Sequence, residues 1–380
     1  MATNLTGNST TGEEEDDALF GLNIVVPIGI IIAIIIIIAI VGNVFTIAAF
    51  IKDRKLRSTY NIYIVNLAVT DLLLGCLSMP FYAVYTLKTH TWPFGYHFCK
   101  AYMVIDFTLC LEAVLVMIIL SLDRLLLLKQ GSQYMHKETN KVACIKIAIS
   151  WVISFLLYSP AIIGWDIWTG QDSNEPGDCD VQFAYNFDFT MATAVIEFGI
   201  PFICLSVLNL IIYLEIRKRI QAKENSKKVP KYQPSSIPVT GTSGSNPVNG
   251  DTSKSQVEQQ RGAAQGTTMQ NAVQPIQDTQ KMRGVRKDTK AAKSLGLLVI
   301  VFAITWAPYT VTTIIISACE ACVNEDVYEF LNWLLWTKAA LNPFLYAYNN
   351  QRFREHFMYF LFCFRKRNRV HTEQTVSTVS

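Results

Sequence analysis

The chain has 380 residues, of which 51% are hydrophobic and only 17% are charged, and its formal net charge is +3. A soluble protein of this length would carry about 25% charged residues, so the composition excludes an ordinary soluble protein. The sequence contains no glycine-rich phosphate loop and no His/Cys cluster with metal-ligand spacing. We therefore expect neither an enzyme nor a cofactor, and no nucleic-acid partner.

The first long apolar segment runs almost without interruption from Ile24 to Phe50. It is too long for the core of a signal peptide, and no small-residue cleavage site follows it. This segment is typical of a membrane-spanning helix. We expect it to be the first of several, because similar apolar blocks recur along the chain.

Charges on the two sides of this first block predict its orientation. Residues 1–21 contain an acidic run at 13–17 and no Lys or Arg, whereas residues 52–57 are strongly basic. Basic residues gather on the inner side of membranes, so the positive-inside rule places the N-terminus outside. Glycosylation sequons at Asn4 and Asn8 agree with this side. We predict a glycosylated extracellular tail.

Seven apolar blocks are long enough to cross a bilayer. Their connections alternate between basic and acidic, which supports the count and places the C-terminus inside. We therefore predict an all-α membrane protein, a seven-transmembrane helix bundle. The blocks are Leu22–Ile51, Thr59–Leu87, Cys99–Leu128, Val142–Trp165, Tyr185–Ile216, Ala291–Ser317 and Tyr328–Tyr348.

The polar stretches complete the organisation. The inner stretch after the fifth block is rich in Ser, Gln, Gly and Asn, which predicts disorder. Apolar residues flanked by basic ones after the seventh block predict a short helix on the inner leaflet. Cys363 on that helix is a palmitoylation candidate, with an unmodified cysteine as the alternative. The predicted parts are the tail 1–21, helices one to five in 22–220, the disordered loop 221–284, helices six and seven in 285–349, the amphipathic helix 350–364 and the cytoplasmic tail 365–380.

Four cysteines lie on the predicted outer side. Cys99 begins the third block and Cys179 lies in the outer loop before the fifth block. Cys319 and Cys322 stand close together in the last outer connection. Because the outside is an oxidising compartment, we expect two disulfides, with free thiols as the alternative.

The third block carries charges at both ends. Asp106 lies near its outer end and the pair Asp123-Arg124 near its inner end. Eighteen residues separate Asp106 from Arg124, roughly 27 Å along a helix, which is close to the thickness of a bilayer core. Charges inside membrane helices are costly, so these residues are candidates for function.

One motif per predicted helix, in order along the chain, resembles the pattern of rhodopsin-class G-protein-coupled receptors, and the likeness covers nearly all of the chain. The motifs are Gly42-Asn43, Leu67-Ala-Val-Thr-Asp71, Asp123-Arg124-Leu125, Trp151, Pro201, Thr305-Trp306-Ala-Pro308 and Asn342-Pro343-Phe-Leu-Tyr346.

The resemblance implies roles for the inner half of the bundle. Arg124 would meet a heterotrimeric G protein and pair with an acid at the base of the sixth helix, here Asp288. Trp306 matches the toggle residue of the family, and Asn342 and Tyr346 match the switch of its seventh helix. The family also implies receptor kinases and arrestin as possible partners, and the histamine-like features described below suggest inhibitory G proteins.

Asp106 matches the acid that binds the ligand ammonium in amine receptors. A carboxylate in an apolar pocket needs a cationic partner, and aromatic rings nearby would complete a cation-binding cage. Simple core packing of these rings is the alternative. The remaining predicted ligand contacts at this end are Tyr309, Trp306, Trp333, Trp336, Phe183 and Cys110.

Glu197 lies four residues before Pro201 and narrows the resemblance to the third and fourth histamine receptor subtypes. Asp106-Phe-Thr-Leu-Cys110 is similar to those subtypes as well. Histamine has two polar ends, so Asp106 would hold its ammonium and Glu197 its imidazole. Thr193, one turn earlier, would add a hydrogen bond. An acid without a ligand role is the alternative for Glu197.

Lys338 departs from the family pattern, which has Asn at this position beside a sodium pocket. Our hypothesis is that its ammonium replaces the ion and pairs with Asp71. The lysine that holds retinal in opsins matches Trp336 here, and two residues turn a helix by about 200°, so we reject an opsin. Glu112 either shares this charge network or bonds to a neighbouring helix.

The sequence therefore predicts a plasma-membrane receptor for a small cationic amine, most simply histamine. Acetylcholine or another monoamine is the alternative within the class. A channel or transporter would need a polar stripe through several helices or an internal repeat, and neither is visible.

Overall fold

The computed structural model describes residues 10–88, 90–170, 177, 179–228, 293 and 295–362. The chain divides into two compact units, residues 1–211 with 293–380, and residues 212–292. All described residues of the second unit continue one helix, 212–228. The first unit contains the helix bundle and the site, and the description below concerns it.

Helices make up the regular structure of the described residues, which contain no strand. In chain order they are α1 (Thr10–Lys52), α2 (Thr59–Leu73), α3 (Met79–Leu87), α4 (Tyr96–Gln130), α5 (Ser132–Lys137), α6 (Asn140–Thr169), α7 (Phe187–Ala194), α8 (Ile200–Lys228), the helix Leu295–Ala318, α10 (Glu325–Asn349) and a short helix at 351–362.

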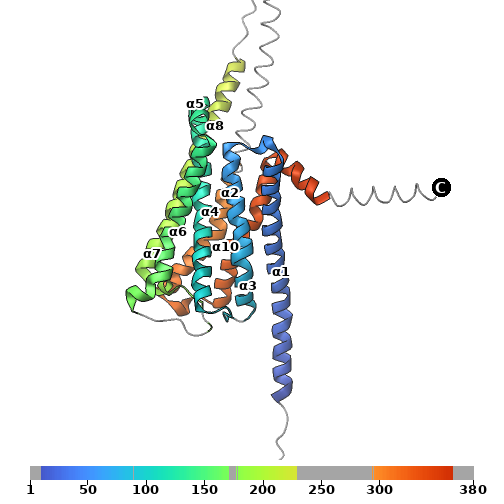
Figure 1. Cartoon of the computed structure of the whole chain (residues 1–380), viewed down its shortest axis with the longest axis vertical. Coiled ribbons are helices and arrows are strands. Elements are labelled where there is room, and N and C mark those ends of the chain that lie inside the picture. Colours follow the sequence, from blue (N-terminus) through green and yellow to red (C-terminus); the bar gives the residue numbers. More distant parts are fainter. Residues whose placement is uncertain are drawn as a thin grey trace, which may run out of the picture. The chain divides into compact units, whose positions relative to one another are not determined.

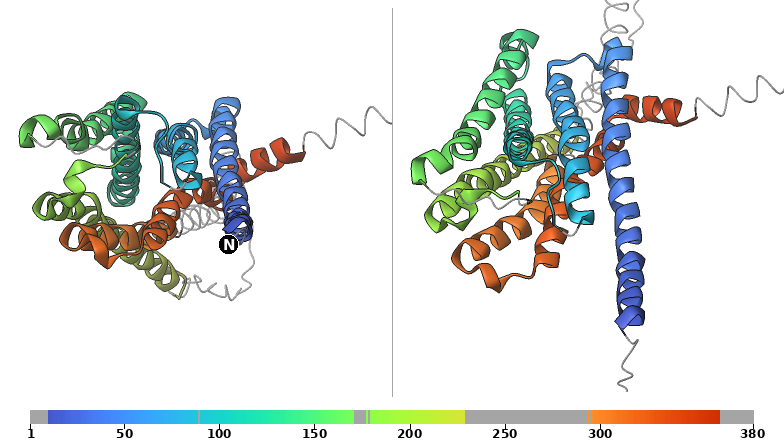
Figure 2. Two further views of the ribbon diagram at one scale, coloured as in Figure 1. Left: turned by 90° about the horizontal axis from the view of Figure 1, so that it is seen from below. Right: turned by 60° about the horizontal axis from the view of Figure 1, so that its bottom comes forward.

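The long helix α4 lies in the middle of its neighbours. It packs against α2 on one side and α6 on the other, while α1 packs against α2 and α10 (Figure 1). The end-on view shows α4 between the blue-green α2–α3 segment and α6 (Figure 2). Residues on α4 can therefore face α2 or α6 as well as the interior.

Within the part of the chain that the structure describes, six helical segments are long and apolar enough to cross a membrane, and α10 completes the bundle. α10 falls below that apolarity because it carries charged and polar residues such as Glu329 and Lys338. The six segments are Val25–Lys52, Thr59–Leu87, Tyr96–Gln130, Asn140–Thr169, Phe187–Ala222 and Leu295–Ala318.

Two π-helical turns interrupt these spans, and a proline follows each. Leu74–Ser78 joins α2 to α3 just before Pro80, and Val195–Gly199 joins α7 to α8 just before Pro201. Proline has no N–H to donate, so the helix loses one regular hydrogen bond and widens locally. The second turn contains Glu197 and sets the direction of its side chain.

Polar side chains of the spanning helices lie in the interior among hydrophobic ones, whereas many large apolar side chains are exposed on the outer surface, as a bilayer requires. On α1, Ile34 and Ile37 are more than half exposed, whereas Asn43 is fully buried. Asn43 Nδ2 donates to the carbonyl of Ala339 on α10 at 3.0 Å. A Cβ on Gly42 would lie 2.8 Å from the ring of Pro343, so only glycine allows α1 and α10 to approach this closely.

Both predicted disulfides are present. Cys99 at the start of α4 is bonded to Cys179, and Cys319 is bonded to Cys322, with Cα–Cα distances of 5.6 and 5.4 Å. These bonds mark one end of the bundle, called the disulfide end below. The opposite end, which carries Arg124, is called the Arg124 end.

Two helices extend beyond the predicted boundaries. α1 begins at Thr10, ahead of the predicted apolar block Leu22–Ile51, and its apolar part is Val25–Lys52. α8 continues to Lys228, beyond the predicted start of the loop at 221. The remaining predictions for Asn4, Asn8, Asp288, Cys363 and the tail 365–380 lie outside the described residues.

The short helix at 351–362 agrees with the predicted amphipathic segment. Phe353 and Phe357 are buried, whereas Met358 and Phe362 are about half exposed. The ring of Phe357 lies 5.8 Å from that of Phe45 on α1. One face of this helix is therefore fixed to the bundle, and the other is apolar and open.

Candidate functional site

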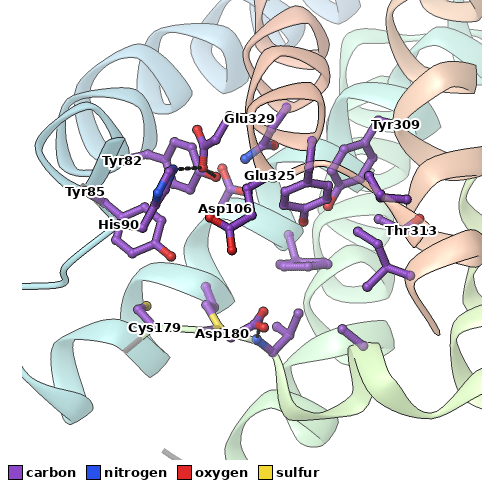
Figure 3. A pocket seen from close by; sticks show the side chains of 18 of the residues that line it. Tyr82, Tyr85, His90, Asp106, Cys179, Asp180, Tyr309, Thr313, Glu325 and Glu329 are labelled. Atoms are coloured by element: carbon purple, nitrogen blue, oxygen red, sulfur yellow. Dashed lines mark hydrogen bonds and ion pairs between the residues drawn. The ribbon is translucent and has the colours of Figure 1, made fainter. Parts of the chain in front are cut away.

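A cavity of about 640 Å³ lies at the disulfide end of the bundle (Figure 3). Its walls come from α3, α4, the helix Leu295–Ala318, α10 and the segment that follows Cys179. The polar and aromatic residues among its lining are Tyr82, Tyr85, His90, Tyr102, Asp106, Phe107, Asp180, Tyr185, Tyr309, Thr313, Glu325, Tyr328, Glu329, Asn332 and Trp336.

Asp106 is the acid of α4 that faces this cavity. The helical period places Tyr102, Met103, Asp106 and Phe107 on one side of α4, and all four line the cavity. The Oδ1 atom of Asp106 is buried and has no hydrogen-bond partner among the described residues. A buried carboxylate oxygen without a donor is costly, so the site is complementary to a cationic donor.

Aromatic rings surround this carboxylate. Tyr82 and Trp336 meet edge to face with ring centroids 4.9 Å apart, and Tyr309 lies 5.9 Å from Tyr328. All four rings line the cavity. Such rings attract an ammonium group through their negative faces and also bury its apolar substituents.

The charges of the cavity favour a cation. Four carboxylates line it, those of Asp106, Asp180, Glu325 and Glu329. The basic side chain among the described lining residues is His90, and no Lys or Arg belongs to the lining. A cleft with charges of one sign focuses its field, which attracts a ligand of opposite charge.

Glu329 was missed by the sequence reasoning. Its carboxylate accepts hydrogen bonds from Tyr82 at 2.6 Å and Thr86 at 3.1 Å, and His90 Nε2 lies 3.4 Å away. These contacts join α3 to α10 beside the cavity, as Figure 3 shows. The available signal was an acid inside the seventh apolar block, seven residues or two helical turns before Trp336.

Of the nine predicted ligand residues, three line the cavity, namely Asp106, Tyr309 and Trp336. Trp333 supports the wall from behind, since its ring lies 5.3 Å from Trp336 and its Nε1 donates to Thr86 at 3.3 Å. The lining does not include the other five, which are Glu197, Thr193, Trp306, Phe183 and Cys110.

Glu197 already has a partner inside the protein. The hydroxyl of Tyr158 on α6 donates to its carboxylate. Thr193 is also engaged, because its hydroxyl donates to the backbone of Phe189 and of Thr190 at 3.0 Å each. The predicted two-ended site is therefore not assembled as one cavity in this structure.

The predicted ion pair between Lys338 and Asp71 is absent. Lys338 is 3% exposed, its Nζ has no hydrogen-bond partner among the described residues, and it lies 3.9 Å from the centroid of the Trp306 ring. Asp71 instead accepts a hydrogen bond from Asn342 at 2.7 Å. The prediction is wrong for this conformation because the ring offers the ammonium an alternative partner.

Glu112 does not share a hydrogen-bond network with Lys338. Its carboxylate accepts hydrogen bonds from Asn66 on α2 at 2.8 Å and from Ser150 and Ser154 on α6 at 2.9 and 3.3 Å. Of the two alternatives that the sequence left open, the structure therefore shows the bond to neighbouring helices.

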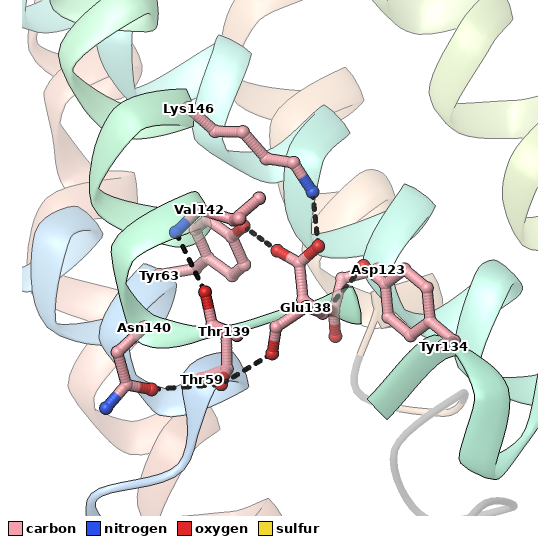
Figure 4. A network of polar contacts seen from close by, with 9 residues as sticks. All are labelled: Thr59, Tyr63, Asp123, Tyr134, Glu138, Thr139, Asn140, Val142 and Lys146. Atoms are coloured by element: carbon pink, nitrogen blue, oxygen red, sulfur yellow. Dashed lines mark hydrogen bonds and ion pairs between the residues drawn. The ribbon is translucent and has the colours of Figure 1, made fainter. Parts of the chain in front are cut away.

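A second polar network lies at the Arg124 end (Figure 4). Tyr134 of α5 donates to Asp123 at 3.1 Å. Glu138, which follows α5, accepts from Tyr63 at 2.6 Å and from Lys146 at 2.7 Å. Burial raises the pKa of Glu138, but the hydrogen bonds from Lys146 and Tyr63 outweigh it and hold this pKa below its ordinary value.

Arg124 itself stacks on a ring from α2. Its guanidinium carbon lies 3.2 Å from the centroid of the Tyr60 ring. The expected partner Asp288 is outside the described residues, so the predicted pair between Arg124 and Asp288 stays a prediction.

The fold, the cavity and the motif order together define a class of membrane receptor. The model of the family "7 transmembrane receptor (rhodopsin family)" matches residues 42–346. The chain belongs to this family, which confirms the predicted seven-helix bundle and the expectation that the protein is a receptor rather than an enzyme.

Individual relatives add detail. The chain is similar to the muscarinic acetylcholine receptor M4 of Gallus gallus, with 24% identity over 86% of this chain and 87% of the relative. It is also similar to the muscarinic acetylcholine receptors M1 of Sus scrofa and Homo sapiens, each with 24% identity over 88% of this chain and 89% of the relative.

Proposed function

We propose that this receptor binds a small cationic amine in the cavity at the disulfide end and responds by activating a heterotrimeric G protein. The observation that carries the proposal is Asp106, which lines the cavity and whose buried Oδ1 atom has no hydrogen-bond partner among the described residues. A protonated amine would supply a donor and a counter-charge for this carboxylate, and a quaternary ammonium would supply the counter-charge alone.

Two amines are candidates, and histamine is the first. Its support is the sequence pattern around Asp106 and Glu197. Glu197 does not line the cavity, and its Oε2 atom already accepts a hydrogen bond from Tyr158. Histamine binding therefore requires a rearrangement at the π-helical turn Val195–Gly199, and turns of this kind are often found at functional sites.

Acetylcholine is the second candidate. It is favoured by the similarity to muscarinic acetylcholine receptors and by the tyrosine-rich wall of the cavity. A quaternary ammonium cannot donate a hydrogen bond, so it relies on aromatic faces and a nearby negative charge. Asp106 with Tyr82, Tyr309 and Trp336 provides both, without any role for Glu197.

The remaining parts of the proposal concern place and partners. Six apolar spans and α10 imply a multi-pass membrane protein, and we infer a plasma-membrane receptor with its N-terminus and disulfide end outside. The Arg124 end would then meet the G protein, of the inhibitory class, and later receptor kinases and arrestin. Ligand binding would act by favouring the conformation that holds the amine better.

A ligand panel tests the proposal. The wild type, Asp106→Asn and Glu197→Gln would be expressed at matched surface levels and treated with histamine, acetylcholine and other monoamines, with G-protein activation as the readout. We expect Asp106→Asn to abolish every amine response. A histamine response that depends on Glu197 supports histamine, whereas an acetylcholine response that does not depend on it supports the second candidate. No response of the wild type to any amine would overturn the proposal.

A further inference from the structure

The ammonium of Lys338 occupies an unusual place in the bundle. It lies on α10 with 3% of the residue exposed, and its Nζ has no hydrogen-bond partner among the described residues. Burying a charge without hydrogen bonds is expensive, so such a group persists only where its surroundings compensate for it. The compensation has two sources, one aromatic and one electrostatic.

The aromatic source is Trp306. The ammonium lies 3.9 Å from the centroid of its ring, and Trp306 is fully buried with no hydrogen-bond partner for its own Nε1. Indole is the best ring for a cation, and the contact is strongest where water is excluded. The structure therefore shows a cation–π contact to a tryptophan whose Nε1 has no hydrogen-bond partner among the described residues.

The electrostatic source is long-range attraction, since the negative charges of Asp71, Glu197 and Asp106 favour an ammonium at Lys338. Asp106 belongs to the cavity wall. A cation bound there would neutralise one of the three charges that hold Lys338 and would also repel its ammonium directly.

Asp71 offers an acceptor close to the next turn of α10. Asn342 lies four residues after Lys338, one helical turn along α10, and donates to Asp71 Oδ2 at 2.7 Å. The other oxygen of Asp71, Oδ1, is buried and has no partner among the described residues. This oxygen is an acceptor for an ammonium that leaves the ring of Trp306.

We propose that Lys338 is a positioning residue with two alternative partners, which holds Trp306 in the ligand-free receptor and moves to Asp71 when a cation binds at Asp106. The charge of the ligand thus affects Trp306 indirectly, through the movement of the Lys338 ammonium. The proposal rests on the proposed function only for its ligand-bound half. The contact between Lys338 and Trp306 is independent of any ligand.

The first test therefore uses the full chain without ligand. Lys338→Met removes the charge at nearly constant volume, and Lys338→Arg keeps a cation that stacks on rings. Ligand-free signalling would be measured with a panel of G-protein α-subunit activation sensors. We expect Lys338→Met to raise it by roughly three- to tenfold, since losing a cation–π contact shifts a two-state equilibrium by about that factor. Lys338→Arg should largely recover the wild-type signal.

Unchanged ligand-free signalling in Lys338→Met at wild-type surface level would overturn the first half of the proposal, that Lys338 holds Trp306 in the ligand-free receptor. If Lys338→Met failed to reach the surface, a comparison of Lys338→Arg with the double variant Lys338→Arg/Trp306→Leu would decide. Higher ligand-free signalling in the double variant than in Lys338→Arg supports the proposal. Equal ligand-free signalling in the two variants overturns it.

The second test examines the destination of the ammonium, with histamine and acetylcholine as probes. Asp71→Asn should lower the maximal response, because the displaced ammonium no longer finds a carboxylate. The double variant Lys338→Met/Asp71→Asn should regain most of that response, since no ammonium then has to move. Additive losses would overturn the second half, as would a sodium-specific loss of agonist affinity at constant ionic strength, which would mean that an ion occupies Asp71. If no probe acts on the wild type, the proposed function fails while the ligand-free result stands.

Discussion

Two acids on α4 show how one helix can use the same chemistry in opposite ways. Asp106 and Glu112 are separated by fewer than two helical turns. Glu112 is fully buried and accepts hydrogen bonds from three side chains of α2 and α6. Asp106 is partly exposed in the wall of the cavity, and its buried Oδ1 atom has no hydrogen-bond partner among the described residues.

The two acids differ both in burial and in the supply of donors, since Glu112 is fully buried among donors whereas Asp106 lies in the wall of the cavity. A satisfied carboxylate joins helices, and removing it leaves donors unpaired. A carboxylate beside a cavity that lacks a donor within the protein can be satisfied by a ligand. The same comparison extends to Glu197, which resembles Glu112 in this structure because Tyr158 donates to it. Four predictions test these distinctions, beginning with the largest expected effect.

Asp106→Asn should reduce amine potency by at least about a hundredfold, because removing one partner of a buried ion pair typically costs about 3–5 kcal/mol. The measurement is a concentration–response curve at matched surface expression. The fold should be retained, since the change removes charge but no packing. Potency within tenfold of the wild type would show that the free oxygen of Asp106 is not the ammonium contact.

Glu112→Leu should have the reverse effect of Asp106→Asn, with stability lowered and amine potency retained. It leaves the donors of Asn66 and Ser154 without this acceptor, at about 1–3 kcal/mol for each buried group that stays unpaired, whereas Ser150 keeps the carbonyl of Ile147 at 2.8 Å. We expect a clearly lower thermal-unfolding midpoint of the purified receptor and lower surface expression. Amine potency of the molecules that reach the surface should stay near the wild-type value.

Glu112→Gln is the matched control for this prediction, because it keeps an acceptor oxygen and should lose much less stability. A loss of potency without a loss of stability in Glu112→Leu would mean that Glu112, too, acts on the ligand.

Tyr158→Phe should leave the carboxylate of Glu197 without the hydrogen-bond donor that it has in the wild type. Deleting one hydroxyl removes the hydrogen bond to Glu197 while the ring packing is retained. If Glu197 binds the imidazole of histamine, histamine potency should rise by roughly three- to tenfold. This range corresponds to about 0.5–1.5 kcal/mol for one hydrogen bond. Acetylcholine potency should not change, which provides the internal control. Equal changes for both amines would assign Tyr158 a general packing role.

The smallest effect concerns Glu138, a carboxylate at the Arg124 end outside the spanning helices. Its folded-state pKa lies below the ordinary value, so its stabilising contribution is present above the unfolded pKa of about 4.3. The contribution is lost as pH falls through the folded pKa. Lys146→Met should lower stability at pH 7 slightly, and the difference from wild type should shrink below about pH 4. A constant difference across this range would exclude the ionised pair as its cause.

Most of the architecture was predictable from the sequence. Hydropathy reveals spans such as Val25–Lys52 because a bilayer admits only long apolar helices, and the motifs from Gly42 to Tyr346 follow the helices in order. The disulfides and the position of Asp106 near one end were predictable for the same reason. α10 is the instructive case, since its charged residues lower its apolarity and mark it as an interior helix.

The partners of the charged residues were not predictable in the same way. They join residues far apart in the sequence, such as Tyr158 with Glu197, Lys338 with Trp306 and Tyr82 with Glu329. A spacing rule gives the face of a helix on which a side chain lies. It does not give the donor that an adjacent helix presents at the same depth.

The sequence by itself therefore determined the class of fold, the number of spans and which charged residues lie inside the membrane, because the free energy of transfer into a bilayer depends on local composition. Only the tertiary structure decided which of those charges are satisfied. It assigns Glu112 and Glu197 to internal hydrogen bonds, places Lys338 over the ring of Trp306, and leaves Asp106 Oδ1 beside the cavity without a hydrogen-bond partner among the described residues. The physical reason is that a hydrogen bond or a cation–π contact depends on distances of a few ångströms between helices, which only packing establishes.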